Sequence, residues 1–137
     1  VHIESDLGPD GHSDADVLIH ALMDAMLGAA GLRDIGYYFP PEDDQYKGIS
    51  SMLLLEKVNF LLKERGLQAY NIDIMVISET PKLKPHIDMM KANLQSILEI
   101  PLDRISIKAT TNEMLGAIGR REGIAAQAVV SVYEGEI

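Results

Sequence analysis

The chain has 137 residues, 47% of them hydrophobic, and 21 acidic residues against 12 lysines and arginines give a formal net charge of -9. This length predicts one domain, the charge argues against a nucleic-acid partner because a polyanion would be repelled, and we expect no membrane span and no signal peptide. Since cysteine is absent, disulfides and thiolate metal sites are excluded, any metal ligands are His, Asp or Glu, and a cytoplasmic protein is favoured.

The first predicted helix follows a turn-rich loop over residues 6–11 and begins at Ser13, with Asp16 completing a capping box. Asp16, His20 and Asp24 then recur at i, i+4 and i+8, which places them on one face of the helix. A histidine with carboxylates one turn either side is typical of a metal ligand whose tautomer is fixed. The alternative is a polar helix start followed by one incidental histidine.

Residues 32–49 show no clear period and are predicted to form a functional or flexible loop. Within it, residues 34–40 suit contact with a polyol, although their aromatic side chains are more typical of core packing. The later predicted elements are a helix from Ser50 or Ser51 to Arg65 with Gly66 ending it, a strand over 70–78, a helix from Pro85 to about Glu99, and strands over 104–109 and 124–133.

Strands that alternate with helices predict a small α+β domain with a mixed sheet and helices packed on one face. A sheet of so few strands leaves its other face bare, so we expect an oligomer.

Three later segments carry polar groups near predicted strand ends. Residues 108–113 combine two hydroxyls, an amide and a carboxylate, which suits phosphate plus a divalent cation; an ordinary polar turn is the alternative. Residues 116–123 place Arg120 and Arg121 on a glycine-rich loop, as an anion site would, although solvated arginines are the commoner case. Residues 78–86 follow a strand's carboxyl end, where ligands usually sit.

Taken in order, these segments closely resemble the 2-C-methyl-D-erythritol 2,4-cyclodiphosphate synthase family through essentially the whole chain. The matching segments are GHSDADVLIHALMDAMLGAAGLRDIG, FP, YKG, PKLKPHI, KATTNEMLG and GRREGIA. The resemblance implies a lyase of the non-mevalonate isoprenoid pathway. Such an enzyme cyclises 4-diphosphocytidyl-2-C-methyl-D-erythritol 2-phosphate to 2-C-methyl-D-erythritol 2,4-cyclodiphosphate and releases CMP.

The same resemblance implies a ferredoxin-like sheet and a homotrimer in which the sheets face each other, with an active site between each adjacent pair of subunits. It implies a Zn²⁺ site and a Mg²⁺ or Mn²⁺ site that act together on the diphosphate. Isoprenoid diphosphates can bind in the central cavity of such a trimer.

Individual roles follow from position in the family's motifs. His20 would be a zinc ligand, with Asp24 or Asp16 as its partner behind the metal, and Glu113 would bind Mg²⁺. His12 would contact the phosphates and help to stabilise the transition state.

Thr111 would act catalytically and would bind the diphosphate together with Thr110. The other substrate-binding residues implied are Ser13 at the phosphates, Asp34 and Gly36 at the methylerythritol hydroxyls, Ser78, Thr80, Pro81, Lys82, Leu83 and Lys84 at the cytidine, Arg120 at the central cavity, and Ile35, Phe39, Pro40, Asp43 and Asn112.

The chain departs from the family pattern at several places, of which Asn112 in place of a threonine is the mildest. The family's first strand carries an Asp-x-His pair that supplies two zinc ligands, whereas Val1-His2-Ile3 matches the strand after it. We therefore expect residues 1–137 to be a single cyclodiphosphate synthase domain lacking its first strand, with weak zinc binding and no activity in this form. Pro41 replaces an aspartate, Ala117 an aromatic residue and Arg121 a glycine.

The competing hypothesis is a non-catalytic trimeric regulatory module that binds a nucleotide. The joint presence of His12, His20, Asp34 and Glu113 favours the enzyme, because a nucleotide sensor would not need them.

Overall fold

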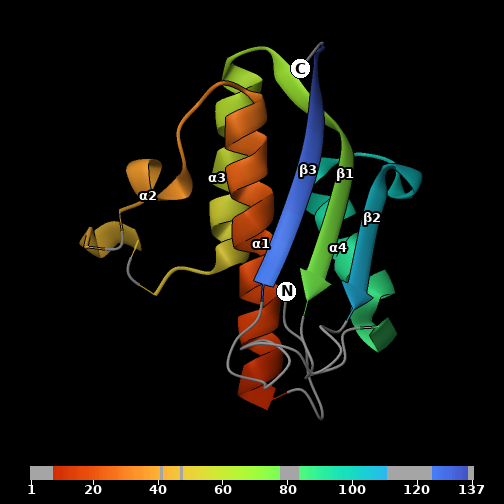
Figure 1. Ribbon diagram of the computed structural model, residues 1–137. Helices are drawn as coiled ribbons and strands as arrows, with labels where there is room; N and C mark the ends of the chain where they lie inside the picture. Colours follow the sequence, from red (N-terminus) through yellow and green to blue (C-terminus); the bar gives the residue numbers. More distant parts are fainter. Residues whose placement is uncertain (1–7, 41, 47, 78–83, 111–124, 136–137) are drawn as a thin grey trace.

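The computed structural model describes residues 8–40, 42–46, 48–77, 84–110 and 125–135. Three helices precede the first strand, a fourth helix lies between the first two strands, and the last strand follows the second without a helix between them in the described residues (Figure 1). The elements are α1 (Gly8–Ala29), α2 (Ile35–Tyr38), α3 (Ser51–Glu64), β1 (Leu67–Ile77), α4 (Ile87–Leu98), β2 (Ile105–Thr110) and β3 (Ala125–Glu134), with short 3-10 turns at Asp44–Tyr46, Lys84–His86 and Leu102–Arg104.

The described strands form a three-stranded sheet in the order β2-β1-β3. The central strand β1 runs parallel to β2 and antiparallel to β3. Parallel neighbours need a crossover connection, and α4 supplies it, so β1, α4 and β2 make a β-α-β unit. The predicted small mixed sheet is confirmed.

One face of this sheet carries the core. Ile72 pairs with Ile105 on β2 and with Val130 on β3, so alternate residues of the three strands line up in rows on the same face. These rows belong to one hydrophobic cluster with the buried side chains of α1, α3 and α4. The helices therefore cover one face of the sheet, as predicted, and burial of this apolar surface is the main stabilising term.

The opposite face of the sheet has no helix over it in the described part of the chain. Val129 on β3 is 72% exposed there, beside its strand partner Asp73 on β1. Asp73 accepts a hydrogen bond from Lys108 on β2, with 3.2 Å between Nζ and Oδ2, and an exposed pair of this kind contributes little to stability. An apolar side chain thus lies in water on an outer strand of the bare face.

Two helix starts differ from the predictions. The first helix begins at Gly8, so Ser13 lies inside α1 rather than at its N-cap, and residues 8–11 are helical rather than loop. Pro9 explains this difference. The N–H groups of a helix's first turn have no partner within the helix, and proline, which has no N–H, is therefore well tolerated there. Likewise Pro85 lies in a 3-10 turn, and α4 begins two residues later at Ile87.

The boundaries around α3 were predicted well. The Ser50 hydroxyl oxygen accepts a hydrogen bond from the Met52 N–H at 3.2 Å and caps the helix. Gly66 follows its end with φ at +72°, a conformation that glycine adopts without strain. β1 starts at Leu67, three residues earlier than predicted. The sequence does not reveal these first residues as strand, because a bulge between Ala69 and Asn71 interrupts the alternation of apolar and polar side chains.

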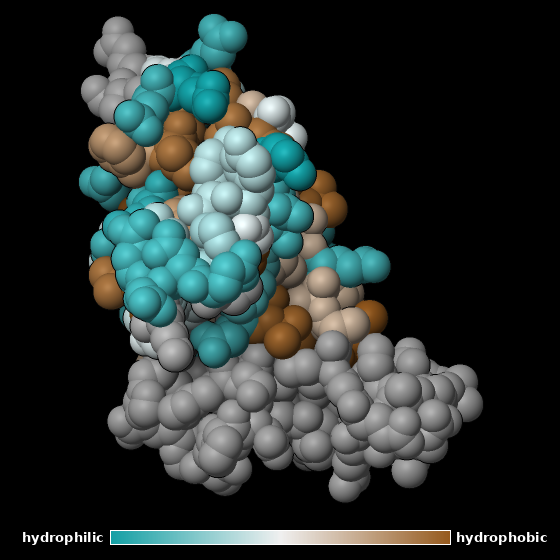
Figure 2. Space-filling view, turned by 90° about the vertical axis from the view of Figure 1, so that its left-hand side faces the viewer, coloured by the Kyte–Doolittle hydropathy of each residue, from teal (hydrophilic) through white to brown (hydrophobic). Residues whose placement is uncertain are grey.

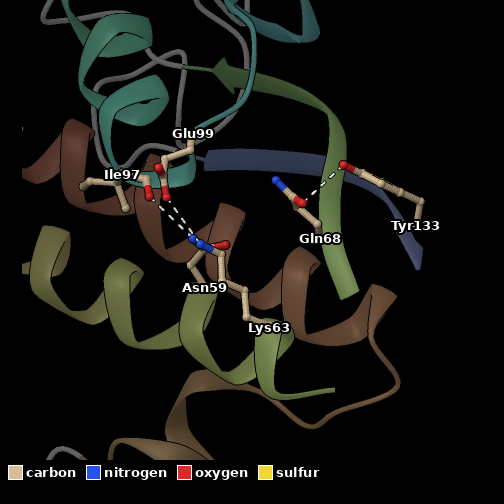
Figure 3. Close-up of polar contacts among 6 residues, drawn as sticks. All are labelled: Asn59, Lys63, Gln68, Ile97, Glu99 and Tyr133. Carbon is tan, nitrogen blue, oxygen red and sulfur yellow. Dashed lines mark hydrogen bonds and ion pairs between the residues drawn. The ribbon is translucent and has the colours of Figure 1, made fainter. Parts of the chain in front are cut away.

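Polar contacts join α3 to the end of α4 (Figure 3). Asn59 is buried, and its Nδ2 donates to the Ile97 carbonyl oxygen at 3.5 Å. Lys63 Nζ lies 3.3 Å from Glu99 Oε1 one turn further along α3. These contacts fix the last turn of α4, whose carbonyl groups lack helical partners, and so hold the crossover between β1 and β2 in place.

Candidate active site

The predicted polar stripe of α1 is present. Asp16, His20 and Asp24 are all exposed, whereas the intervening Leu18, Ile19, Leu22 and Met23 are completely buried. The helix is amphipathic, so its packing against the sheet turns His20 and the two aspartates away from the core. The prediction that they share one face of the helix is confirmed.

Both aspartates contact other segments of the chain. Asp16 Oδ1 accepts a hydrogen bond from the Ser51 hydroxyl at 2.7 Å, and Asp24 Oδ1 accepts one from the Ile35 N–H at 2.9 Å. Among the described residues, His20 has no hydrogen bond to either carboxylate. The aspartates therefore hold the starts of α3 and α2 in this structure, rather than the imidazole.

The donors needed for a complete metal site are not brought together by the described residues. No group of three or more histidine, aspartate and glutamate side chains that could hold an ion occurs in that part of the chain. A catalytic zinc ion takes three protein ligands, and His20 is one nitrogen donor. This set alone does not fit a zinc ion.

The segment from Asp34 to Gly36 starts the short helix α2. Asp34 caps the helix, its Oδ1 accepting from the Tyr37 N–H at 3.0 Å, and its side chain is exposed. A carboxylate has a second oxygen that can accept from another donor. The nearest non-neighbouring atom to a Cβ added at Gly36 would be Asp34 Oδ1 at 3.7 Å, so the backbone here is open beside the carboxylate. This arrangement suits a hydroxylated ligand.

The aromatic residues after Gly36 pack mainly against the protein itself. Tyr38 and Phe39 lie against the hydrophobic core, and the Phe39 ring meets Tyr46 edge-on with centroids 5.1 Å apart. Together with Phe60 of α3 and other side chains they line an open groove of about 490 Å³. Figure 2 shows the side on which this segment projects, where the coloured surface is mainly hydrophilic with small hydrophobic patches.

Pro40 and Asp43 complete the predicted contacts of this segment. Pro40 is half-buried, and Asp43 makes two contacts with Gln45, accepting from its backbone N–H at 3.1 Å and from its side-chain amide at 3.3 Å. Asp43 therefore shapes the turn that begins at Asp44.

Three strand ends that adjoin predicted ligand-binding segments lie side by side at one end of the sheet. Ile77, the last residue of β1, pairs with Thr110 at the end of β2 and with Ala125 at the start of β3. Residues 78–83 follow β1, and residues 111–124, which include the predicted residues Thr111 and Arg120, connect β2 to β3. The amino-terminal half of α1 lies at the same end of the molecule, toward which β1 and β2 point (Figure 1). Ligands of such sheets usually bind at this edge.

Several predicted residues lie outside the description. The backbone of His12 and Ser13 belongs to α1 and that of Lys84 to a 3-10 turn, whereas their side chains are not described. The remaining predicted residues outside the described ranges are Ser78, Thr80, Pro81, Lys82, Leu83, Thr111, Asn112, Glu113 and Arg120, together with the departures Pro41, Ala117 and Arg121.

Sequence reasoning missed one residue at this site, Ser51. It was considered only as a helix cap, yet its hydroxyl binds Asp16, which lies 35 positions earlier. No local pattern signals a contact between residues so far apart in the chain.

Within the described ranges, none of the helices combines the length and apolar character that crossing a membrane requires.

Comparison with known proteins adds an independent finding. The YgbB family model matches residues 1–133. A 2-C-methyl-D-erythritol 2,4-cyclodiphosphate synthase of Synechococcus elongatus is 57% identical over 129 residues, which cover 94% of this chain and 81% of that protein. A relative of the same name from Halothermothrix orenii is 54% identical over 98% of this chain and 81% of its own length.

A solved structure with a similar fold is the bifunctional IspDF from Campylobacter jejuni. It has a TM-score of 0.81 and 45% identity, and the match covers 85% of this chain and 31% of that one.

Proposed function

Because the chain belongs to the YgbB family, we propose that it works as a 2-C-methyl-D-erythritol 2,4-cyclodiphosphate synthase, an enzyme of isoprenoid biosynthesis. The 2-phosphate of the cytidylyl substrate attacks the β-phosphorus, the bond from that phosphorus to the oxygen bridging the α-phosphate breaks, and CMP leaves. The observation that carries this assignment is 57% identity to a synthase of that name across 94% of the chain. The regulatory alternative is not favoured, since the curated relatives are named as synthases.

The reaction gathers several negative charges, so charge neutralisation and in-line positioning supply most of the catalysis. The nucleophile is already an anion and needs no strong base. In our proposal the segments at the sheet end hold the nucleotide, with residues 78–84 at the cytidine and Thr110 and Thr111 at the diphosphate. Asp34 and Gly36 hold the methylerythritol hydroxyls, and His12 donates to the phosphates. The pairing of Ile77 with Thr110 supports the first part of this assignment.

Metal ions are part of the proposal, with His20 as a ligand of Zn²⁺ and Glu113 as a ligand of Mg²⁺ or Mn²⁺. Such ions neutralise phosphate charge when they are bound. The described residues do not complete either set of ligands, and no step above depends on an ion.

Assembly is the remaining part of the proposal. The bare sheet face with its exposed Val129 supports a ferredoxin-like sheet that faces its copies in a homotrimer. Since α1 turns His20 away from the core while the nucleotide segments leave the end of the sheet, we propose that adjacent subunits contribute one part each to a shared site. Arg120 faces the central cavity, which takes an isoprenoid diphosphate, and the enzyme works in the cytoplasm.

The cytidylyl substrate, supplied to the purified full-length protein with Zn²⁺ and Mg²⁺, tests this function. We expect CMP and the cyclic diphosphate to appear in equal amounts. We also expect CDP to raise the midpoint temperature of thermal unfolding, because a ligand that binds only the folded state stabilises it. CDP is chosen because a solved relative, IspF of Plasmodium falciparum, is a CDP complex. That structure is 29% identical with a TM-score of 0.76, and the match covers 88% of this chain and 72% of that one. Stabilisation by CDP without release of CMP would instead favour the regulatory module.

A further inference from the structure

We propose that Asp16 and Asp24 are positioning residues that fasten both ends of the 35–51 segment to the face of α1 that carries His20. The two contacts are the 2.7 Å hydrogen bond from Ser51 to Asp16 and the 2.9 Å hydrogen bond from the Ile35 N–H to Asp24. The inference rests on the proposed function, because residues 35–43 include the proposed methylerythritol contacts.

The spacing of the two contacts defines a closed loop. Asp16 and Asp24 lie one turn before and one turn after His20, so they are about 12 Å apart along the helix axis. The 16 residue steps from Ile35 to Ser51 reach roughly 55 Å when extended, and a flexible chain of that length has ends roughly 20 Å apart. The two attachment points on α1, on either side of His20, therefore lie closer together than the ends of a free chain of this length would on average.

The contact at Asp24 also orients the first turn of α2. The Ile35 N–H is one of the amino-terminal donors that a helix leaves without a helical partner, and Asp24 accepts from it. Asp34 accepts from another, the Tyr37 N–H. Two carboxylates from different segments thus fix the backbone on either side of Gly36, beside the proposed hydroxyl contacts.

Both hydrogen bonds are exposed. Water competes for exposed donors and acceptors, so each bond contributes little to the free energy of unfolding. The buried face of α1, which packs on the sheet, does not involve either aspartate. Loss of a contact should therefore loosen that end of the segment without unfolding the domain, while Tyr38 and Phe39 still pack against the core.

The test compares Asp16→Ala and Asp24→Ala with Asp16→Asn and Asp24→Asn. The amide oxygen of asparagine keeps an acceptor at the same place, while alanine removes it. We expect both alanine variants to be cut faster by chymotrypsin within residues 37–46, and Asp24→Ala to speed hydrogen exchange at the Ile35 amide at least ~10-fold. Asparagine should restore both, and the exposed Asp88→Ala on α4 should change neither.

Kinetics give a second measurement. A displaced contact weakens alignment of the substrate, so each alanine variant should raise KM about 10-fold and leave kcat within about twofold. Ser51→Ala should raise KM as much as Asp16→Ala does. The double variant that carries both substitutions should raise KM no further, because each single substitution already removes the same hydrogen bond.

The proposal is overturned if the alanine variants leave exchange and proteolysis unchanged. It is also overturned if they lower zinc affinity, as partners of a metal-bound histidine do, while the segment stays protected. Faster exchange and proteolysis in a protein that never releases CMP would support the positioning role and contradict the proposed function, so the two failures are distinguishable.

Discussion

Glu113→Gln is expected to lower kcat at least ~10²-fold, the usual cost of losing one electrostatic contributor. Glutamine keeps the size of the side chain but removes the charge by which Glu113 is proposed to bind a divalent cation at the diphosphate. Glu113 comes three positions after Thr110, which ends β2 beside Ile77 at the end of β1. The measurement is CMP release at saturating substrate, together with the thermal midpoint to show that the fold is intact.

The matched control for this variant is Glu134→Gln. Glu134 is exposed at the opposite end of the sheet, where it pairs with Leu67, so the same loss of one charge should leave turnover unchanged. Wild-type turnover by Glu113→Gln would remove Glu113 from the mechanism.

Val129→Lys is expected to prevent the proposed trimer from forming and to abolish activity with it. Val129 is 72% exposed on the sheet face that no helix covers in the described part of the chain. Facing sheets would bury three lysines near one another, and burying unpaired like charges is strongly unfavourable. Analytical ultracentrifugation should show the mass of one chain, and CMP release should fall below detection, since a site shared by two subunits does not form in a monomer.

Two control variants separate this effect from loss of folding. Val129→Thr keeps the shape of the side chain without a charge and should remain trimeric. Met89→Lys adds the same charge at another exposed apolar residue, 47% exposed on α4, and should remain trimeric and active. An active trimer of Val129→Lys would show that subunits do not meet through this face.

Local chemistry explains how much of the fold the sequence predicts. Ser50 and Gly66 mark the ends of α3 because a cap and a positive φ are properties of single residues. The predicted start of the first helix at Ser13 was wrong, because Gly8 and Pro9 are as typical of turns as of a first helical turn. The early start of β1 was missed because a bulge breaks its alternation.

In the candidate site too, features set by local spacing are predictable and contacts between distant residues are not. Helical spacing places Asp16, His20 and Asp24 on one face, and the structure confirms it. The partners of the two aspartates were not predictable, because Ser51 and Ile35 lie 35 and 11 residues away in the chain and meet them only after folding. The four-residue helix α2 is too short to show a period. The bare sheet face predicts an oligomer, but no pattern in a single chain identifies which residues of two subunits would meet.

Mixing two inactive variants, His20→Ala and Glu113→Gln, tests whether adjacent subunits share the site. If His20 and Glu113 of one site come from different chains, subunits reassembled in equal amounts regain about a quarter of wild-type activity, because about a quarter of the adjacent pairs then hold both intact residues. Differently tagged chains show by native mass spectrometry that mixed trimers form. No chain in the mixture carries both residues intact, so only a site that takes His20 from one chain and Glu113 from another can be active. Mixed trimers that release no CMP would contradict this shared site.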